Sequence, residues 1–511
     1  MRSGSTDFVQ GLGVAFFATS ALVALSGCAQ LAEGVAQTAS VAASDIETEA
    51  AASIVLFMGD GMGVSTVTAA RIYAGQKLGN TGEEHSLNFE TFPDVSLVKT
   101  YNTDMQVPDS AGTMSAIVTG IKTRAGVLSI APSVPRGDCA AALAAPTVTL
   151  LEQMEAKGLR TGIVSTATIT HATPAATYAH SADRNWESDS EMPEAAKAAG
   201  CRDIAAQLIE FADHNLGSDG IDVILGGGRA NFFPEATVDP EYPEQTGNRT
   251  DGRDLAAEWL AGGEDRTYVW NTGQFEAAQS GSGQVFGLFE PSHMQFDADR
   301  DVSPGGEPSL AAMTAFAIKR LKAMSNGQPF FLMVEAGRID HAHHFNNAYR
   351  ALEDTLALDA AVVAAQEQLG EDSLIIVTAD HSHTFTISGY PKRGNPMLGL
   401  VRGPDGELGK DLNGQPYTTL GYANGSSAAK LAGVRKANDG ELPALTDDEV
   451  LATDYQQIST VPLRAETHAG EDVAAYAIGP GSDAVRGVME QNKLFDVMRS
   501  VLPTSVTSTK K

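Results

Sequence analysis

Basic residues are scarce in this chain. Its 511 residues include 35 Lys and Arg against 64 Asp and Glu, which gives a formal net charge of −29 at pH 7. Because Lys and Arg bind the phosphate backbone of nucleic acids, this balance excludes a nucleic-acid-binding surface. It fits an acidic, soluble exterior. Salt would screen the repulsion among the negative charges on that surface. If the substrate is an anion, local cations must attract it.

Long hydrophobic runs are also missing. The apolar segment 12–25 follows Arg2 and is too short to span a bilayer comfortably. Its position and length are typical of an export signal. It ends in Leu-Ser-Gly-Cys, which resembles a bacterial lipobox and implies cleavage before Cys28 and lipidation of its thiol. The alternative is an ordinary cleaved signal with a chance cysteine.

These N-terminal features predict where the protein works. We expect a signal peptide over 1–27 and a flexible tether over 28–52, whose Ala, Ser, Thr and Glu content suits a linker. The protein is then exported to the bacterial periplasm or cell surface and anchored to a membrane through lipidated Cys28.

Cysteine is rare, with three residues in the whole chain. Beyond Cys28 only Cys139 and Cys201 remain. An oxidising compartment outside the cytoplasm permits these two to pair. Two buried free thiols are the alternative.

Beyond residue 52 the sequence alternates short apolar runs with helix-like segments. A helix is expected from about 65 to 74, and the clearest strand candidates are 54–57, 162–165, 222–225, 330–334, 374–378 and 473–478. This alternation predicts an α/β fold with a doubly wound, mostly parallel central sheet flanked by helices. We assign the folded domain to 53–502 and a frayed tail to 503–511. Two stretches without a dominant period, 229–310 and 390–465, are interpreted as insertions.

Ionisable residues follow several of these apolar runs. Asp60 comes after the first run, Glu335 ends the run at 330–334, and Asp380-His381 follow the run at 374–378. The carboxyl ends of strands in an open α/β sheet meet at one crevice, so these groups are expected to lie together. They would repel one another or stay poorly solvated unless a cation held them. The pattern predicts a multi-metal site and chemistry on an anionic substrate.

The segment 335–344 carries the strongest of these signals. Asp340 and His344 are four residues apart, so on a helix they share one face and can bind one ion. A solvated, polar helix start is the alternative. Asp380-His381 could serve a second ion, and the competing interpretation is a catalytic Asp-His pair without metal.

A serine precedes a helical run at 114–118. Ser110 follows Asp109, and a helix N-terminus is a place where backbone N–H groups favour an anion. The simpler alternative is an N-cap serine, and no Gly-x-Ser-x-Gly elbow surrounds it. His468, before the last strand candidate, offers another imidazole that by itself would more often be structural.

Six motifs in this order resemble the alkaline phosphatase family from about residue 53 to 502. They are Gly59-Asp60-Gly61-Met62-Gly63, Asp109-Ser110-Ala111-Gly112-Thr113, His171-Ala172-Thr173-Pro174 with Arg184 beyond it, 335–344, Thr378-Ala379-Asp380-His381-Ser382 and Thr467-His468-Ala469-Gly470. The resemblance implies a metal-dependent phosphomonoesterase on the α/β fold. It would convert small phosphate monoesters to alcohol and inorganic phosphate through a phosphoserine intermediate.

The resemblance also implies a role for each matching residue. It implies two zinc sites, one formed by Asp340, His344 and His468, the other by Asp60, Asp380, His381 and the Ser110 oxygen. It implies one magnesium site formed by Asp60, Thr173 and Glu335. Ser110 would be the nucleophile, Arg184 would clamp the phosphate, and Asp109 would orient Arg184.

Other residues resemble the vertebrate-like branch of the family. His171 and His341 stand where other bacterial members carry Asp and Lys, which implies contacts to magnesium-site waters or, through water, to phosphate. Packing alone is the alternative for either ring. Cys139 and Cys201 match a disulfide of this branch, and 390–465 corresponds to its crown-like insertion. The family is usually homodimeric.

The same branch implies a calcium site within 229–310. Its ligands would be Glu241, the Phe289 carbonyl, Glu290 and Glu307. Asp301 is the substitute for Glu307, because the spacing there departs from the family by a short insertion.

Two other functions are weighed against this one. A phosphodiesterase or sulfatase of the same superfamily is the enzymatic alternative. Sulfatases carry a Pro and Arg motif that is absent around Ser110, and diesterases commonly use Thr and lack a match to Arg184. A non-catalytic surface lipoprotein that stores or senses metal would need the ligands but neither of those two residues.

Overall fold

The computed structural model describes residues 51–215, 217–437 and 443–503. The predicted signal peptide over 1–27, Cys28, nearly all of the tether over 28–52, and the tail beyond Pro503 lie outside the described residues. Within the described ranges, none of the helices combines the length and apolar character needed to cross a membrane.

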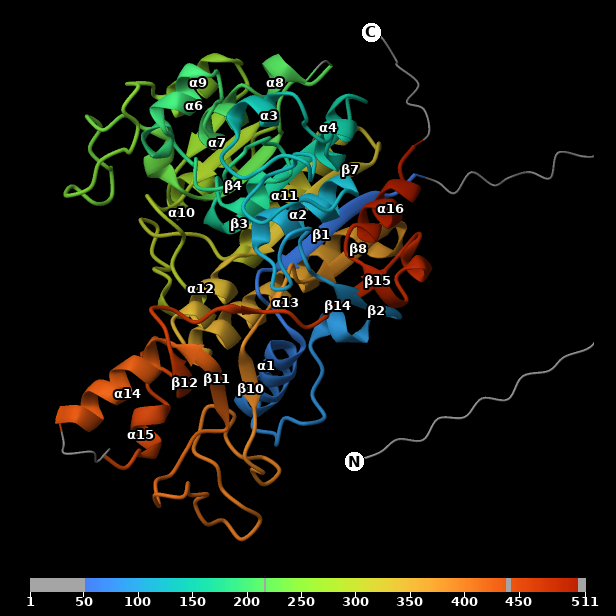
Figure 1. The fold of residues 1–511 in the computed structure, drawn as a ribbon. Helices are drawn as coiled ribbons and strands as arrows, with labels where there is room; N and C mark the ends of the chain where they lie inside the picture. Colours follow the sequence, from blue (N-terminus) through green and yellow to red (C-terminus); the bar gives the residue numbers. More distant parts are fainter. Residues whose placement is uncertain (1–50, 216, 438–442, 504–511) are drawn as a thin grey trace, which may run out of the picture. The chain divides into compact units, whose positions relative to one another are not determined.

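The core is a ten-stranded sheet in the order β15-β2-β14-β8-β1-β7-β3-β4-β6-β5 (Figure 1). β14 runs antiparallel to both of its neighbours, and every other neighbouring pair is parallel. This confirms the mostly parallel sheet. Its strands are β1 Ser53–Gly59, β2 Asp94–Lys99, β3 Arg160–Thr168, β4 Val223–Gly227, β5 Thr267–Val269, β6 Val285–Leu288, β7 Phe330–Ala336, β8 Ser373–Thr378, β14 Val473–Ile478 and β15 Gly487–Glu490.

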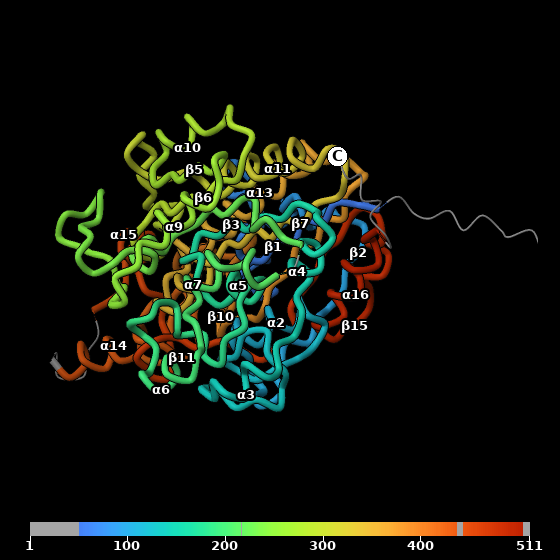
Figure 2. The backbone as a smooth tube through the Cα atoms, turned by 90° about the horizontal axis from the view of Figure 1, so that it is seen from above, coloured from blue at the N-terminus to red at the C-terminus, as the bar shows by residue number. Residues whose placement is uncertain are grey.

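Helices cover both faces of this sheet, as Figure 2 shows with α11 and α13 on one side of β1, β7 and β3 and α2 and α4 on the other. The helices are α1 Val64–Lys77, α2 Ser110–Thr119, α3 Cys139–Leu143, α4 Leu150–Glu155, α5 Ala172–Ala175, α6 Glu194–Ala198, α7 Ile204–Ile209, α8 Phe211–His214, α9 Leu255–Ala261, α10 Thr272–Ala278, α11 Leu310–Ser325, α12 Arg338–His344, α13 Ala348–Leu369, α14 Ser426–Ala437, α15 Asp447–Val450 and α16 Lys493–Ser500. The sheet is therefore doubly wound.

The strands at the centre of the sheet are buried on both faces, and this explains their continuous apolar sequences. All seven residues of β7 and all six of β8 are buried, as are six of the seven in β1. β1 lies between β7 and β8 and is parallel to both. The chain therefore leaves all three strands at the same edge of the sheet.

The first predicted insertion, 229–310, is partly built into the core. Its strands β5 and β6 extend the central sheet beyond β4. The sequence pattern missed them because β5 has only three residues and Gly287 interrupts the apolar run of β6.

The second predicted insertion, 390–465, forms a small structure of its own, drawn in orange at the lower left of Figure 1. Its strand β11 Leu420–Gly425 pairs with β10 Phe385–Ile387, which precedes the insertion, and with β12 Ser459–Pro462, and α14 contacts both β11 and β12. The Tyr422 hydroxyl lies 2.8 Å from His343 Nδ1 of α12, so this small sheet contacts α12 directly.

Cys139, at the start of α3, and Cys201, after α6, form a disulfide. The predicted pairing is confirmed, and the alternative of two free thiols is wrong. The bond joins two segments that pack against a small apolar cluster around Val127, Ile130 and Trp186.

Candidate metal centre

The chain brings six distant segments to the carboxyl edge of the sheet. Asp60 follows β1, Glu335 lies near the end of β7, and Asp380-His381 follow β8. Helices and a short strand supply the rest: Ser110 begins α2, Thr173 lies in α5, Asp340 and His344 lie in α12, and His468 begins β13. The predicted convergence of ionisable groups at strand ends is what the structure shows.

The approach of β1 to this edge requires a glycine at position 61. Gly61 has φ +70°, and a Cβ there would lie 2.3 Å from His383 Nε2. Its backbone N–H also donates to Asp380 Oδ1 at 3.0 Å. Any side chain at this position would displace groups of the site.

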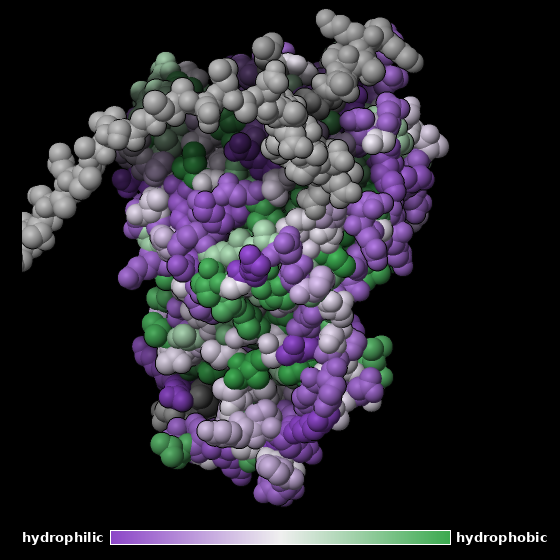
Figure 3. Space-filling model, turned by 90° about the vertical axis from the view of Figure 1, so that its right-hand side faces the viewer, coloured by the Kyte–Doolittle hydropathy of each residue, from purple (hydrophilic) through white to green (hydrophobic). Residues whose placement is uncertain are grey.

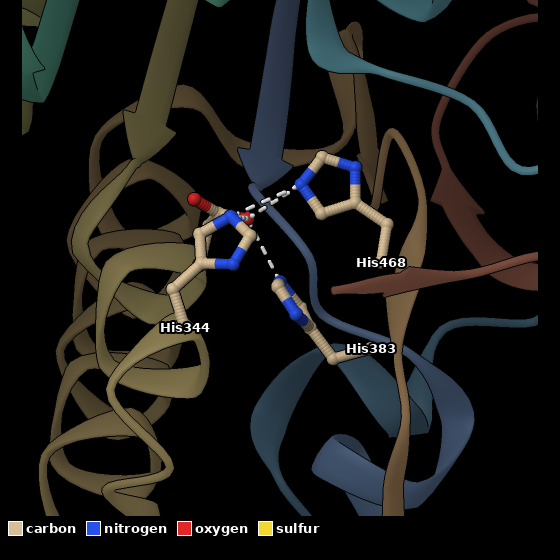
Figure 4. A group of neighbouring side chains, drawn as sticks. His344, His383 and His468 are labelled. Carbon is tan, nitrogen blue, oxygen red and sulfur yellow. Dashed lines mark hydrogen bonds and ion pairs between the residues drawn. The ribbon is translucent and has the colours of Figure 1, made fainter. Parts of the chain in front are cut away.

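The first group of side chains, here called the imidazole set, comprises Asp340, His344, His383 and His468. One ligand atom from each lies within 4.8 Å of the others. Figure 4 shows the three imidazoles turned toward one carboxylate, with Asp340 Oδ1 at 2.8 Å from His383 Nε2, 3.2 Å from His468 Nε2 and 3.3 Å from His344 Nε2. An aspartate with several imidazoles is a donor set that suits zinc.

The outer nitrogens of this set are also fixed. His344 Nδ1 lies 2.6 Å from the Glu466 carbonyl oxygen, and His468 Nδ1 lies 2.8 Å from the Pro108 carbonyl oxygen. A carbonyl can only accept, so each Nδ1 carries the proton and each Nε2 lone pair faces the cluster. Such partners fix the tautomer and orientation of metal-binding histidines.

The second group, the serine-side set, comprises Asp60, Ser110, Asp380 and His381, all at most 2% exposed. His381 Nε2 lies 3.2 Å from Ser110 Oγ, 3.2 Å from Asp380 Oδ2 and 3.4 Å from Asp60 Oδ1. Among the described residues, both carboxylate oxygens of Asp60 and Oδ2 of Asp380 are buried without a hydrogen-bond partner.

Unpaired buried carboxylates carry a large free-energy cost, and a cation would remove it. Burial, followed by the charge of Asp380, raises the pKa of Asp60 well above its ordinary value. The serine-side set therefore fits a divalent ion in contact with the serine oxygen.

The third group, the oxygen set, comprises Asp60, Thr173 and Glu335. Thr173 Oγ1 and Glu335 Oε1 are buried without a hydrogen-bond partner in the described part of the chain. The other Glu335 oxygen accepts a hydrogen bond from Ser165, and burial raises the pKa of Glu335 to about 7. Hard oxygen donors of this kind suit magnesium. A His171 nitrogen also lies within 4.8 Å of ligand atoms of Asp60 and Glu335.

The positive side of the site is supplied by Arg184. Its Nη1 lies 3.3 Å from Asp109 Oδ2 and its Nη2 lies 2.9 Å from His171 Nε2. Asp109 caps α2 by accepting from the Gly112 N–H at 3.1 Å. Burial opposes ionisation of Asp109, but Arg184 and the backbone donors prevail and lower its pKa. A charged Asp109 thus holds the guanidinium at the N-terminus of α2, where Ser110 is the first residue.

Three residues of the site went unassigned in the sequence: His383, Glu466 and His293. His383 joins the imidazole set through a two-residue ladder in which β9 Ser382–His383 pairs with β13 His468–Ala469. The sequence placed His383 two residues after His381, and that spacing was the available signal. Nothing in the sequence connected Glu466 or His293 to the site.

The predicted calcium ligands lie in the segments before and after β6. Glu290 and Glu307 are 7% and 2% exposed, and Glu307 Oε2 is buried without a partner among the described residues. Glu241 instead lies 3.1 Å from Arg229 Nη2. These carboxylates are not among the described groups whose ligand atoms all lie within 4.8 Å of one another. Asp301 bonds to the N–H and hydroxyl of Ser303 in its own loop.

Cations held beside a serine oxygen can lower the pKa of its hydroxyl and stabilise the charge that develops during group transfer to water. The fold and the site therefore define a metal-dependent hydrolase.

Comparisons with known proteins identify the family. A family model described as alkaline phosphatase matches residues 51–504. The tissue-nonspecific alkaline phosphatase of Gallus gallus is 43% identical over 456 residues, which cover 88% of this chain and 84% of that protein. The chain belongs to the alkaline phosphatase family, and it is a phosphomonoester hydrolase.

Solved structures agree on the fold. The alkaline phosphatase of Thermus thermophilus has a TM-score of 0.62 at 23% identity, covering 89% of this chain and 92% of that one. A variant of the TAB5 alkaline phosphatase, described with Mg bound in its M3 site, has a TM-score of 0.58 at 22% identity, covering 89% of this chain and 98% of that one. The α/β fold class predicted from the sequence is confirmed.

Proposed function

We propose that this enzyme hydrolyses phosphate monoesters in two steps through a phosphoserine at Ser110. Ser110 Oγ forms a bond to phosphorus as the bond to the alcohol oxygen breaks. Water then cleaves the new Oγ–P bond and releases inorganic phosphate. The observation that carries this proposal is the Ser110 Oγ position, 3.2 Å from His381 Nε2 and among unpaired buried carboxylates.

Two zinc ions and one magnesium ion fit the three donor sets. We assign zinc to Asp340, His344 and His468 and to Asp60, Asp380, His381 and Ser110, and magnesium to Asp60, Thr173 and Glu335. Bound there, the ions would lower the pKa of the serine hydroxyl and stabilise the leaving oxygen.

Arg184 binds the phosphate in this proposal. A planar guanidinium can donate to two nonbridging oxygens at once, which an ammonium group cannot match. Asp109 keeps the guanidinium oriented, and His171, 2.9 Å from Arg184 Nη2, supports it from the other side. His171 and His341 would contact the waters around the magnesium ion.

A calcium ion at Glu241, the Phe289 carbonyl, Glu290 and Glu307 completes the metal content. The buried, unpaired Glu307 Oε2 supports Glu307 as the ligand, because the Asp301 carboxylate is already occupied by Ser303.

We further propose that the enzyme is exported, anchored through Cys28 in the periplasm or at the cell surface, and homodimeric. Support for the dimer comes from an apolar patch on the side shown in Figure 3. Val488 of β15 is the register partner of Leu97 of β2, and together with Val95 these residues are 60%, 43% and 45% exposed. Contiguous exposed apolar surface of this kind marks interaction sites.

The decisive experiment replaces the nucleophile. Ser110→Ala should retain its zinc yet lose hydrolysis of an aryl phosphate by about 10³-fold or more. Ser65→Ala, in α1 outside the three sets, is the matched control and should retain full activity. Full activity in Ser110→Ala would contradict the phosphoserine mechanism, and faster cleavage of the corresponding diester by the unaltered enzyme would favour the phosphodiesterase alternative.

A further inference from the structure

His293 has no role in the proposed mechanism. It lies beside His171, one nitrogen of which is within 4.8 Å of ligand atoms of Asp60 and Glu335 in the oxygen set. It belongs to the segment that follows β6, and the backbone holds this segment on both sides of the histidine. The Gly228 N–H donates to the Ser292 carbonyl at 2.7 Å, and the Met294 N–H donates to the Thr166 carbonyl at 3.0 Å. The ring is therefore presented from a fixed backbone, not from a loose loop.

One hydrogen bond determines the tautomer of His293. The backbone N–H of Thr168, at the end of β3, donates to His293 Nδ1 at 3.0 Å. A backbone N–H can only donate, so Nδ1 is the unprotonated nitrogen and the proton of the neutral ring is on Nε2. Among the described residues, Nε2 forms no hydrogen bond, which leaves an N–H donor available for a ligand.

Two other imidazoles surround this ring. The centroid of His293 lies 4.2 Å from that of His341 and 5.6 Å from that of His171. Arg338 Nη1 lies 3.0 Å from His341 Nδ1, and Arg184 Nη2 lies 2.9 Å from His171 Nε2. Because arginine can only donate, the proton of each neutral ring is on its other nitrogen. The free nitrogen of His171, Nδ1, is buried without a partner among the described residues.

One nitrogen of each ring accepts from Arg338, Arg184 or the Thr168 N–H, so the proton of the neutral ring is on the other nitrogen. Burial, followed by the charge of Arg338, lowers the pKa of His293 to about 4. A neutral N–H does not bind a bare cation, but it does bind the oxygen of a water molecule that the cation holds.

We propose that His293 is a positioning residue of the oxygen set, whose Nε2–H donates to the water shell of the cation held by Asp60, Thr173 and Glu335. It acts with His171 and His341 as a third imidazole donor. This inference rests on the assignment of a magnesium ion to that set. Magnesium keeps several of its waters when a protein binds it, so donors to those waters contribute to affinity.

The test distinguishes the effect of losing the N–H donor from the effect of losing the aromatic ring. His293→Phe keeps a flat ring and removes the N–H, whereas His293→Gln keeps an N–H at a similar reach. Zinc-loaded, magnesium-free protein is titrated with Mg²⁺ by calorimetry, and the rise in unfolding temperature with added Mg²⁺ is measured in parallel. His293→Phe should bind Mg²⁺ about 10- to 100-fold more weakly, as is typical for lost outer-shell partners, and His293→Gln should stay close to the unaltered protein.

Controls keep the outcomes distinct. His214→Phe changes a histidine of α8 whose side chain is 65% exposed, and it should leave Mg²⁺ affinity unchanged. If phenylalanine disturbs folding, His293→Leu gives the same comparison with His293→Gln. Unchanged affinity in His293→Phe, or an equal loss in His293→Gln, overturns the donor role. If the unaltered protein binds no Mg²⁺, or if Glu335→Gln binds Mg²⁺ equally well, the magnesium assignment fails as well.

Discussion

His383 Nε2 lies 2.8 Å from Asp340 Oδ1, and its Nδ1 lies 2.5 Å from Glu466 Oε2. Both nitrogens therefore face carboxylates, and each must donate. Burial disfavours the charged ring, but Glu466 and Asp340 prevail and raise the pKa of His383 to about 10. The Thr384 N–H donates to the other oxygen of Glu466 at 2.7 Å. This chain of contacts fixes the carboxylate that His344 and His468 approach.

Removing His383 should therefore weaken zinc binding without removing a predicted zinc ligand. His383→Ala should lower the zinc affinity of the imidazole set by about 10- to 100-fold, because outer partners orient the ligands. Competition with a chelator of known affinity measures this change. His85→Ala, at a half-buried position before β2 and outside the three sets, is the control. Equal zinc affinity in His383→Ala and the unaltered protein would show that Asp340 needs no such support.

Arg184 should determine phosphate affinity more than metal content. Hydrogen bonds to charged groups contribute about 1.5–3 kcal/mol, so Arg184→Ala should weaken inhibition by inorganic phosphate about 10- to 100-fold. Arg184→Lys should recover only part of this affinity, because an ammonium group lacks the planar pair of donors. The inhibition constant of phosphate is the measurement, and zinc content should not change.

Arg136→Ala is the matched control for this prediction. Arg136 pairs with Asp183, next to Arg184 in sequence, through a contact of 2.7 Å, and its side chain is 43% exposed. It should leave the inhibition constant unchanged. A similar loss in both variants would mean that general charge, and not the Arg184 position, attracts the anion.

The sequence predicted the parts of the site that follow long, buried strands. Asp60, Glu335 and Asp380 follow or end β1, β7 and β8, whose unbroken apolar runs identify central parallel strands, and their convergence follows from the sheet. The family resemblance, not the strand pattern, indicates which metal each of these residues would bind. The strand pattern by itself predicts only that these carboxylates share a cation site.

The remaining residues depend on tertiary contacts that have no local pattern. His383 reaches the site through β9 and β13, two residues each, which are too short to show a strand period. His293 reaches it because a backbone segment is fixed between Gly228 and Thr166, which lie far away in sequence. Such contacts become visible only once the chain is folded.

The calcium assignment can be tested at Glu307. The unaltered protein should unfold at a higher temperature when Ca²⁺ is added, since a ligand that binds only the native state stabilises it. Glu307→Gln should lose most of this Ca²⁺-dependent increase while its zinc content and turnover stay the same. Asp301→Asn is the comparison, because the Asp301 carboxylate bonds within its own loop. If Asp301→Asn loses the Ca²⁺ response and Glu307→Gln keeps it, the ligand assignment is wrong.

Glu155, at the end of α4 and remote from the metal centre, should make stability depend on pH. Its residue is 1% exposed, and its carboxylate accepts hydrogen bonds from the hydroxyls of Thr161 and Ser218. Burial raises its pKa to about 8 in spite of these donors. A carboxyl group with a raised folded pKa stabilises the fold while protonated. This contribution is complete below the ordinary pKa and is lost as pH rises toward about 8.

Glu155→Gln mimics the protonated group at every pH. Its stability relative to the unaltered protein should therefore increase as pH rises. The difference in unfolding free energy should grow from the ordinary carboxyl pKa of 4.5 up to about pH 8 and level off above it, reaching at most about 5 kcal/mol. Unfolding of both proteins, zinc-saturated at each pH, provides the measurement. Glu264→Gln, which removes an exposed carboxylate, should show no such trend. A difference between Glu155→Gln and the unaltered protein that stays constant with pH would mean that Glu155 is ionised throughout this range, with its charge compensated by the hydroxyls around it.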